Sequence, residues 1–366
     1  MSRVSLLSPM THPQPGSLTR RQAISGGLAS VAVGLASGGS GFGMNTESLM
    51  PIPPPLNTVG ETIVGSLSGK EIFIPNVGAP PIPSIVPPGI VCNGLKAAAF
   101  EGVDLSTGYP DACSFKRRFG LLIPATNTAM EYDLWSIIFN NQGEGALEGV
   151  GLHTTTVITP KPDVGTAEGR ENFKRQFLGG VKTSTTNALL AAPQYLILGL
   201  SLEHILSGLP AIHDEMEDIR SYSILSWAFW EDAAKAALKC YGAKRIGLLT
   251  PWEKLGNASA VKMFEDMGVE VVATAGFSCG NIQHIAHIPD WAKEKAILEL
   301  LATKENKLDA IVQCGTNMSM MKVTEKLEPR IGIPILAINP TIFWYALREN
   351  GFKSPLVKSG RLLREF

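Results

Sequence analysis

The chain has 366 residues, of which 45% are hydrophobic and 18% charged, so it is long enough to bury a large core. Its 32 basic and 33 acidic side chains leave a net charge of -1, which excludes nucleic-acid binding through bulk positive charge. Five cysteines without a Cys-x-x-Cys pair exclude a disulfide-stapled scaffold, and the composition predicts a soluble α/β or mixed globular protein.

The first 115 residues differ in composition from the rest, with 14 of the 25 prolines but only 11 charged side chains. Near their start stands Thr19-Arg20-Arg21-Gln22-Ala23-Ile24, followed by a weakly apolar run to Ala36. This pattern resembles a twin-arginine export signal. We therefore predict that residues 1–43 are an export leader and that the protein is periplasmic. If the leader is only a basic N-terminus without that function, the protein is cytoplasmic.

Residues 44–115 contain two proline clusters, Met50-Pro51-Ile52-Pro53-Pro54-Pro55 and Pro80-Pro81-Ile82-Pro83. Such clusters favour extended or polyproline conformations. We predict an irregular arm, with one short strand at residues 71–75.

A repeat opens the part that we predict to fold as a domain, residues 116–366. The hexamer Phe119-Gly120-Leu121-Leu122-Ile123-Pro124 returns almost unchanged as Ile246-Gly247-Leu248-Leu249-Thr250-Pro251. Each apolar run predicts a buried parallel strand. After a turn that contains Asn127 or Asn257, each strand is followed by a predicted helix, at residues 130–139 and 258–267.

The alternation of strands and helices continues to the C-terminus. Strands are predicted at residues 195–198, 308–313 and 334–338, and a helix at residues 341–350 ends before Gly351. The pattern predicts an α/β fold of two similar Rossmann-like lobes, with parallel sheets and helices on both faces. Lobe 1 takes in about residues 116–224 and 336–366, and lobe 2 about residues 225–335.

Ligands of open α/β sheets bind beyond the carboxyl ends of the strands, so a cleft between the lobes is the predicted site. Five segments follow predicted strands and would meet there: residues 124–131, 199–204, 250–257, 314–317 and 339–341.

Cys314 is the strongest single candidate, because it directly follows an apolar strand. A helix N-terminus after it would lower the pKa of the thiol and suit it to acid–base or nucleophilic chemistry. The alternative is an inert buried cysteine. Cys279 stands in a turn near the predicted cleft and is a weaker candidate.

Small polar residues surround this candidate at the other strand ends. Thr126 and Asn127 form a polar turn that would hold a carboxylate, or would only cap the following helix. Ser201 and Gly315 offer the same choice between binding and turn formation. Glu203-His204 beside Ser201 hints at a hydrolase, but no Gly-x-Ser-x-Gly elbow is present.

The sequence predicts no metal site. His284, His287 and Asp290 are spaced three apart, but Pro289 interrupts the pattern and no fourth ligand is evident.

Taken together, the strand-end segments resemble the aspartate/glutamate racemase superfamily, and most of all its arylmalonate decarboxylase and maleate cis–trans isomerase branches. The resemblance covers about residues 117–352. Four segments carry it: Phe119 to Glu131, Leu249-Thr250-Pro251-Trp252 with Asn257, Gln313-Cys314-Gly315, and Ile338-Asn339-Pro340-Thr341-Ile342-Phe343-Trp344. In this chain Trp252 stands where the family usually has Tyr.

The resemblance implies an enzyme that needs no cofactor and binds a small carboxylate or dicarboxylate, with Cys314 as the catalytic residue. The substrate-binding residues that it implies are Asn127, Thr126, Gly199, Ser201, Trp252, Asn257, Gly315 and Asn339. Racemases and isomerases of the superfamily use two cysteines, one in each lobe. Near Gly199-Leu200-Ser201, where the first would fall, this chain has none, as in the decarboxylases. Leu200, however, stands where the decarboxylases carry a hydroxyl.

The sequence therefore predicts a decarboxylase of a substituted malonate, in which Cys314 protonates an enediolate and hydroxyl and backbone donors stabilise it. Two alternatives remain open. One is a maleate-isomerase-like or racemase-like enzyme, which a second cysteine such as Cys279 facing Cys314 would favour. The other is a carboxylate-binding protein without turnover.

Overall fold

The computed structural model describes part of the chain: residues 61–67, 70–75, 113–143, 146–158 and 166–366. All of them fall within one compact unit, Pro55–Phe366. The predicted leader and most of the predicted arm lie outside the described residues, so export stays a prediction. Within the arm, β1 (Glu61–Leu67) pairs with β2 (Lys70–Pro75) in antiparallel fashion, which confirms the strand predicted there.

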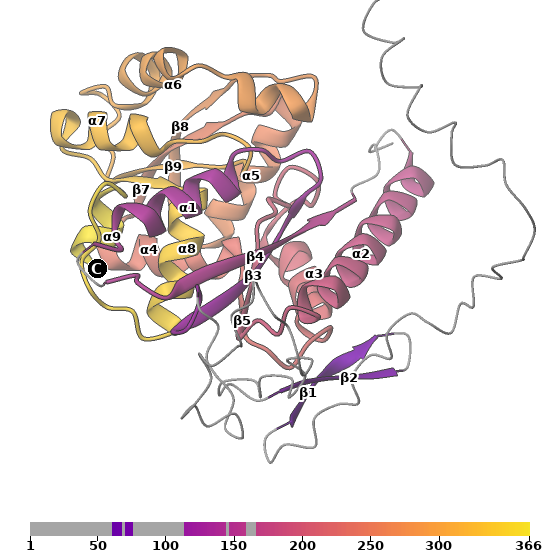
Figure 1. Ribbon diagram of the computed structural model, residues 1–366. Helices are drawn as coiled ribbons and strands as arrows, with labels where there is room; N and C mark the ends of the chain where they lie inside the picture. The colour runs from indigo at the N-terminus through magenta and orange to yellow at the C-terminus, as the bar shows by residue number, and fades with distance from the viewer. Residues whose placement is uncertain (1–60, 68–69, 76–112, 144–145, 159–165) are drawn as a thin grey trace, which may run out of the picture. The chain divides into compact units, whose positions relative to one another are not determined.

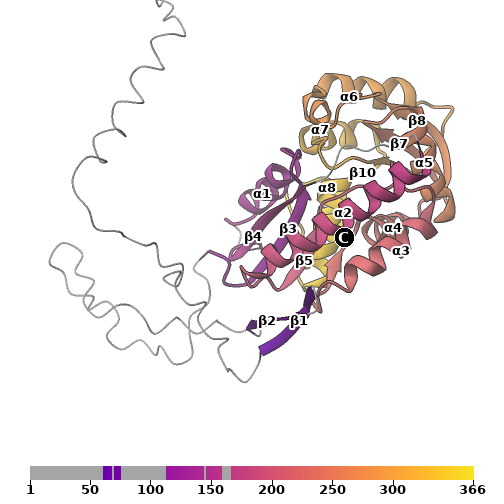
Figure 2. The same ribbon diagram turned by 90° about the vertical axis from the view of Figure 1, so that its right-hand side faces the viewer.

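From Arg117 onward the chain builds two parallel four-stranded sheets, which confirms the predicted α/β fold class (Figure 1). In spatial order, the first sheet consists of β4 (Val150–Val157), β3 (Arg117–Pro124), β5 (Tyr195–Leu198) and β6 (Trp227–Ala228). The second consists of β10 (Ile335–Ala337), β9 (Ala310–Gln313), β7 (Arg245–Thr250) and β8 (Glu270–Gly276). In both Figure 1 and Figure 2, β7 and β8 lie above β3, β4 and β5.

The helices connect these strands and cover the sheets. They are α1 (Met130–Asn140), α2 (Ala167–Leu189), α3 (Leu209–Arg220), α4 (Trp230–Tyr241), α5 (Lys254–Asp266), η3 (Ile282–His287), α6 (Asp290–Ala296), η4 (Ile297–Leu301), α7 (Met321–Ile331), α8 (Ile338–Glu349) and α9 (Arg361–Glu365). α1, α2 and α8 pack against strands of the first sheet, and α5 and α7 pack against strands of the second.

Two helices begin earlier than the sequence predicts. α5 begins at Lys254 rather than residue 258, so Asn257 lies in its first turn and not in the preceding loop. α8 begins at Ile338 rather than residue 341, so Asn339 and Pro340 are helical. Proline fits there because the first N–H groups of a helix have no partner within it. Strand pairing also sets the lobe boundaries a few residues later than predicted, since β6 bonds to the first sheet and β10 to the second.

Alternate residues of the central strands enter two hydrophobic clusters. In β7, Leu248 packs into the larger cluster, which includes the first sheet, and Leu249 packs into the smaller one. In β9, Val312 and Ile311 divide in the same way. The two-residue period of a strand therefore explains why these runs are continuously apolar: both faces of the sheet are covered.

We expect Phe119→Ala to lower the free energy of unfolding by about 3–5 kcal/mol, because it empties a filled site. The Phe119 side chain is fully buried, and its ring lies edge-on to Tyr195 and Phe343 with centroids 5.9 Å away in each case. Urea denaturation followed by circular dichroism measures the loss. The matched control is Phe139→Ala, whose ring is 63% exposed and should cost under about 1 kcal/mol. Equal losses in the two variants would contradict this account of the core.

Candidate active site

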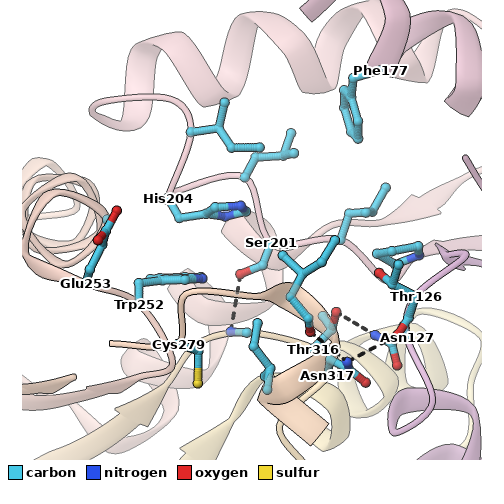
Figure 3. A pocket seen from close by; sticks show the side chains of 18 of the residues that line it. Thr126, Asn127, Phe177, Ser201, His204, Trp252, Glu253, Cys279, Thr316 and Asn317 are labelled. Atoms are coloured by element: carbon cyan, nitrogen blue, oxygen red, sulfur yellow. Dashed lines mark hydrogen bonds between the residues drawn. The ribbon is translucent and has the colours of Figure 1, made fainter. Parts of the chain in front are cut away.

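A cavity of about 280 Å³ opens where the carboxyl ends of the two sheets meet. Four of the five predicted strand-end segments contribute to it, from the ends of β3, β5, β7 and β9. The segment at residues 339–341 does not reach it. The lining residues are Pro124, Thr126, Asn127, Phe173, Phe177, Leu200, Ser201, Leu202, His204, Ile205, Trp252, Glu253, Leu255, Gly256, Cys279, Ile282, Ile285, Gly315, Thr316 and Asn317 (Figure 3).

The predicted binding residues divide into two groups. Thr126, Asn127, Ser201, Trp252 and Gly315 line the cavity. Gly199, Asn257 and Asn339 do not, and neither does Cys314.

Asn127 joins the two lobes at the floor of the cavity. Its Nδ2 donates to Thr316 Oγ1 over 2.8 Å, and Thr316 Oγ1 in turn donates to the Gly199 carbonyl over 3.1 Å. Its Oδ1 accepts from the N–H groups of Ala129 and Met130 at 2.9 and 3.0 Å, which caps α1. The amide oxygen and one of the two amide N–H groups of Asn127 are thus engaged within the protein. Capping, the simpler of the two roles considered for Asn127, is present in the structure.

Asn317 forms a second connection between the lobes. Its Oδ1 accepts from Thr128 N–H at 2.9 Å, and its Nδ2 donates to the carbonyls of Thr126 and Ile282, each at 3.2 Å. The sequence placed Asn317 in a strand-end segment, but nothing in the pattern indicated that it would bridge to the turn after β3.

Gly315 has a backbone conformation that a side chain would disturb. Its φ is +90°, in the left-handed region, and a Cβ atom built on it would lie 2.6 Å from Pro251 Cγ. Its N–H donates to Ser201 Oγ over 3.3 Å. The glycine therefore brings a backbone N–H to the cavity, next to a hydroxyl of the opposite lobe.

The hydroxyl group of Ser201 is hydrogen-bonded to a buried carboxyl group. Its Oγ lies 2.6 Å from Glu203 Oε1, and the Glu203 residue is 1% exposed. Burial raises the pKa of Glu203 above its usual range, while the hydrogen bond with Ser201 opposes the rise. The sequence indicates Glu203 only as part of a weak hydrolase pattern with Ser201 and His204. Its position beside Ser201 and Cys314 was not predicted.

Cys314 is 0% exposed and lies next to Glu203, and it does not line the cavity although the adjoining Gly315 does. Burial raises the pKa of the Cys314 thiol well above its usual range, and the neighbouring Glu203 raises it further. The lowered pKa expected from a helix N-terminus is therefore wrong, because α7 begins only at Met321 and desolvation dominates. Cys314 is a protonated thiol near neutral pH.

His204 and Trp252 form a stacked aromatic wall, with ring centroids 5.0 Å apart and planes inclined by 17° (Figure 3). Burial lowers the pKa of His204 to about 4, so its ring is neutral. Since the Ser201 hydroxyl bonds to Glu203, the catalytic contact of a Ser–His hydrolase is not formed. In Figure 3 the indole nitrogen of Trp252 is directed to the side on which Ser201 lies.

The two asparagines outside the cavity have structural partners. Asn257 Oδ1 accepts from the Thr250 hydroxyl, which ties α5 to the end of β7. Asn339 is buried and donates through Nδ2 to Asp133 Oδ2 at 2.8 Å and to the Thr316 carbonyl at 2.9 Å. Asn339 therefore stabilises the loop that follows Cys314 through its bond to Thr316, and it does not line the cavity.

Among the residues that the structure describes, no group of three or more His, Cys, Asp or Glu side chains is placed to hold a metal ion. The rings of His284 and His287 lie 5.7 Å apart in η3. In the same described ranges, no helix is both long and apolar enough to cross a membrane.

Asp133 should make stability depend on pH. It is fully buried, accepts from Ser319 Oγ at 2.6 Å and from Asn339, and has Lys293 and Asp290 nearby. Burial raises its pKa from 3.8 to about 6. The folded state thus holds the proton more tightly than the unfolded state. The stabilisation is complete below about pH 4 and is lost as the pH rises through about 6.

We expect the free energy of unfolding of the unaltered chain, relative to Asp133→Asn, to fall by on the order of 3 kcal/mol over that interval. Urea titrations at a series of pH values measure the difference. Asp214→Asn, at an exposed position of α3, is the control and should leave the pH profile unchanged. If Asp133→Asn follows the profile of the unaltered chain, the assignment of the raised pKa is wrong.

Comparisons with known proteins give one matching family model and several structures with a similar fold. Residues 211–363 match the family model for arylmalonate decarboxylase, whereas a search of curated proteins gave no match. The maleate cis–trans isomerase of Nocardia farcinica, solved with a covalently bound succinylcysteine intermediate, is 20% identical with a TM-score of 0.57, over 68% of this chain and 99% of that one. The maleate isomerase of Pseudomonas putida S16 is 17% identical with a TM-score of 0.60, over 68% and 98%.

A liganded arylmalonate decarboxylase, with one Gly replaced by Cys and one Cys by Ser, is 14% identical with a TM-score of 0.55, over 68% of this chain and 100% of that one. At these identities the similarity of structure shows the fold. The resemblance drawn from the sequence is confirmed: residues 211–363 match the arylmalonate decarboxylase family, and the fold is the one found in the maleate isomerases and arylmalonate decarboxylases of the aspartate/glutamate racemase superfamily.

Proposed function

We propose that the protein is a cofactor-independent decarboxylase of a malonate that carries an apolar side group. The substrate loses one carboxylate as CO2, and the enediolate that remains takes a proton on carbon from Cys314. The family match and the fold support an enzyme of this kind, and the geometry around Gly199 favours decarboxylation over isomerisation.

Gly199 is the observation that carries the proposal. A Cβ atom at this position would lie 2.5 Å from Met130 Sδ and 2.7 Å from Ile123 Cγ2, closer than real Cβ contacts allow. The Gly199 N–H also donates to the Leu122 carbonyl over 2.7 Å, which fixes the backbone there. A side chain at the position near which a two-cysteine enzyme would carry its first thiol would therefore have to displace Met130 and Ile123, which favours protonation from one face only.

The lining of the cavity suits a substrate with an apolar side group. Its walls are mainly apolar, with Phe177, Leu200 and Trp252 among them, and no Lys or Arg is among the described residues that line it. A malonate dianion gains no cationic partner there. The loss of neutral CO2 leaves both negative charges on the enediolate, which hydrogen-bond donors stabilise until Cys314 protonates its carbon and a monocarboxylate remains. Leu200, in place of the hydroxyl that decarboxylases carry, adds to the apolar wall.

The protonation step requires the thiol to reach the substrate. The S–H bond of Cys314 breaks, its proton forms the new C–H bond, and a thiolate remains that takes a proton from solvent before the next cycle. Because Cys314 is buried and does not line the cavity, its side chain has to turn toward the cavity when the substrate is bound. The raised pKa suits this role, since the thiol arrives with its proton.

Cys279 gives a reason to keep an isomerase as the second candidate. It lines the cavity, which a second catalytic thiol would have to do. In Figure 3, however, its sulfur is directed away from Ser201 and Asn127. A carboxylate-binding protein without turnover would use the same cavity and would need neither thiol.

Cys314→Ala should abolish the release of CO2 from arylmalonates and alkylmalonates, with a loss of at least about 100-fold, because it removes the proposed proton donor to the enediolate. The full chain is incubated with these malonates and with maleate, and CO2 and fumarate are both measured. Cys240→Ala, in α4 and outside the cavity, is the matched control and should retain the rate.

Three other outcomes would redirect the assignment. Fumarate formation that is lost in Cys279→Ala would identify an isomerase. Thermal stabilisation by a dicarboxylate without any product would identify a binding protein. Undiminished CO2 release by Cys314→Ala would show that the proton donor is a different residue.

Gly199→Cys tests the steric argument directly. We expect this variant to unfold at lower urea concentration than the unaltered chain, since overpacking typically costs about 1–3 kcal/mol. It should not gain racemase or isomerase activity. Gly280→Cys, at a turn where a Cβ atom would meet nothing within 4 Å, is the control for introducing a thiol. A stable Gly199→Cys variant that racemises the product would refute the steric argument.

A further inference from the structure

Ser201 Oγ occupies a junction between the cavity and a buried acid. It is 2.6 Å from Glu203 Oε1 on one side and 3.3 Å from the N–H of Gly315 on another, and Ser201 itself lines the cavity. A serine hydroxyl has one proton to donate and two lone pairs with which to accept. The protonation state of Glu203 therefore decides what Ser201 offers to a ligand.

The two states of Glu203 have opposite consequences. An ionised carboxylate only accepts hydrogen bonds, so the Ser201 proton would have to point at Glu203 and a lone pair would remain for the cavity. A neutral carboxyl group donates its own proton to Ser201 Oγ, and the Gly315 N–H fills the second lone pair. The Ser201 proton is then directed to the cavity, where it meets a carboxylate oxygen.

The surroundings of Glu203 favour the neutral state. The polar groups that act on it are the Ser201 hydroxyl, its own backbone, the Cys314 thiol and the indole N–H of Trp230 at the start of α4, and none of them carries a positive charge. His204, the next residue in the chain, has a neutral ring. The Trp230 indole nitrogen is buried and has no hydrogen-bond partner of normal geometry, so it adds little to stabilise a charge. A buried carboxylate without a cationic partner is strongly disfavoured.

We propose that Glu203 is a positioning residue: as a neutral acid it donates to Ser201 Oγ and turns the Ser201 hydroxyl into a donor for the carboxylate of the ligand. The inference deepens the proposed function, on which it rests only in that the cavity receives a carboxylate. It needs neither decarboxylation nor a reactive Cys314.

A dependence of binding on pH follows. Glu203 is neutral below its pKa in the folded protein, which lies above its usual value, and Ser201 is a donor there. As the pH rises through that pKa, the proton of Ser201 turns back to Glu203 and a second negative charge faces the ligand. Affinity for a carboxylate must therefore fall as the pH rises, while affinity for an uncharged ligand of the same shape changes less.

Phenylacetate is the probe, since it is an ionised, unreactive carboxylate of the kind that decarboxylation of an arylmalonate would leave. Its dissociation constant is measured calorimetrically with the full chain from about pH 6 to about pH 9, a range in which the carboxyl group of the probe stays ionised. Phenylacetamide serves as the uncharged comparison. The variants are Glu203→Gln, Glu203→Ala, Ser201→Ala and the double variant Glu203→Ala/Ser201→Ala.

Glu203→Gln should bind phenylacetate within about threefold of the unaltered chain at low pH and should show no loss at high pH, because the amide N–H donates to Ser201 in place of the acid. Glu203→Ala should bind about tenfold more weakly at low pH, and Ser201→Ala should match it. The double variant should be no worse than either single variant, since both remove the same donor. Glu328→Gln is the control: Glu328 is also buried, with its pKa raised by burial to about 7, but it does not line the cavity. This control should keep the pH dependence of the unaltered chain.

Three results would overturn the inference: a Glu203→Gln variant whose affinity still falls with pH, a Glu203→Ala variant that binds as tightly as the unaltered chain, or no binding of phenylacetate at any pH. A thermal melt of each variant shows whether it is folded, and Glu203→Gln, which keeps size and shape, is the decisive one. The proposed function fails separately, when CO2 is not released from any malonate although phenylacetate binding follows Glu203 as described.

Discussion

The chain from Asn127 through Thr316 to the Gly199 carbonyl is the connection on which the arrangement of the site depends. It joins the ends of β3, β9 and β5, and so ties one sheet to the other at the edge where the cavity opens. Each of these groups is buried, and a buried donor or acceptor that loses its partner costs about 1–3 kcal/mol. Side-chain hydrogen bonds therefore hold the two lobes in one relative position, and a ligand does not need to break them.

This connection also sets the backbone of the Cys314 loop. Asn339 donates a hydrogen bond to the Thr316 carbonyl. Asn317, the next residue in the chain, bonds to the backbone of the turn after β3. Between them, Gly315 adopts its left-handed conformation and points its N–H at Ser201. The polar groups that line the cavity are thus placed by hydrogen bonds to one another across the two lobes and, at Thr316, by Asn339 outside the cavity, which is how a binding site is pre-organised.

Several parts of this arrangement follow from local sequence patterns, and others do not. The repeated hexamers at residues 119–124 and 246–251 predict two equivalent strands, and continuous apolar runs predict a sheet that is covered on both faces; both are present. The direction of a side chain after a strand ends is a tertiary property. Because of this, the pattern placed Cys314 at the right strand end but did not show that it faces the buried Glu203.

The errors have two physical causes. The expected pKa of Cys314 was inferred from a helix dipole, a local effect, whereas desolvation by the whole fold raises it. Phe173 and Phe177 line the cavity from α2. The rule that ligands bind beyond the carboxyl ends of strands does not predict residues in the middle of a helix. The sequence predicts the start of the last long helix at Thr341, with Pro340 just before it, whereas α8 begins at Ile338 and Pro340 lies within its first turn. In each case a contact distant in the sequence, or the exact position within an element, determined the result.

The absence of cationic side chains among the described residues of the cavity wall connects burial with chemistry. Glu203 and Cys314 are both disfavoured as anions by the same desolvation, so each retains its proton. Only hydrogen-bond donors can stabilise a ligand that brings negative charge into this environment, and the cavity has few of them. The proposed decarboxylation begins with two carboxylates and ends with one, and it consumes a proton that Cys314 supplies and solvent replaces. An isomerisation of a dicarboxylate consumes no proton and keeps both charges from substrate to product. The same burial that raises the pKa of Cys314 thereby keeps a proton available for the step that the proposed reaction needs and an isomerisation does not.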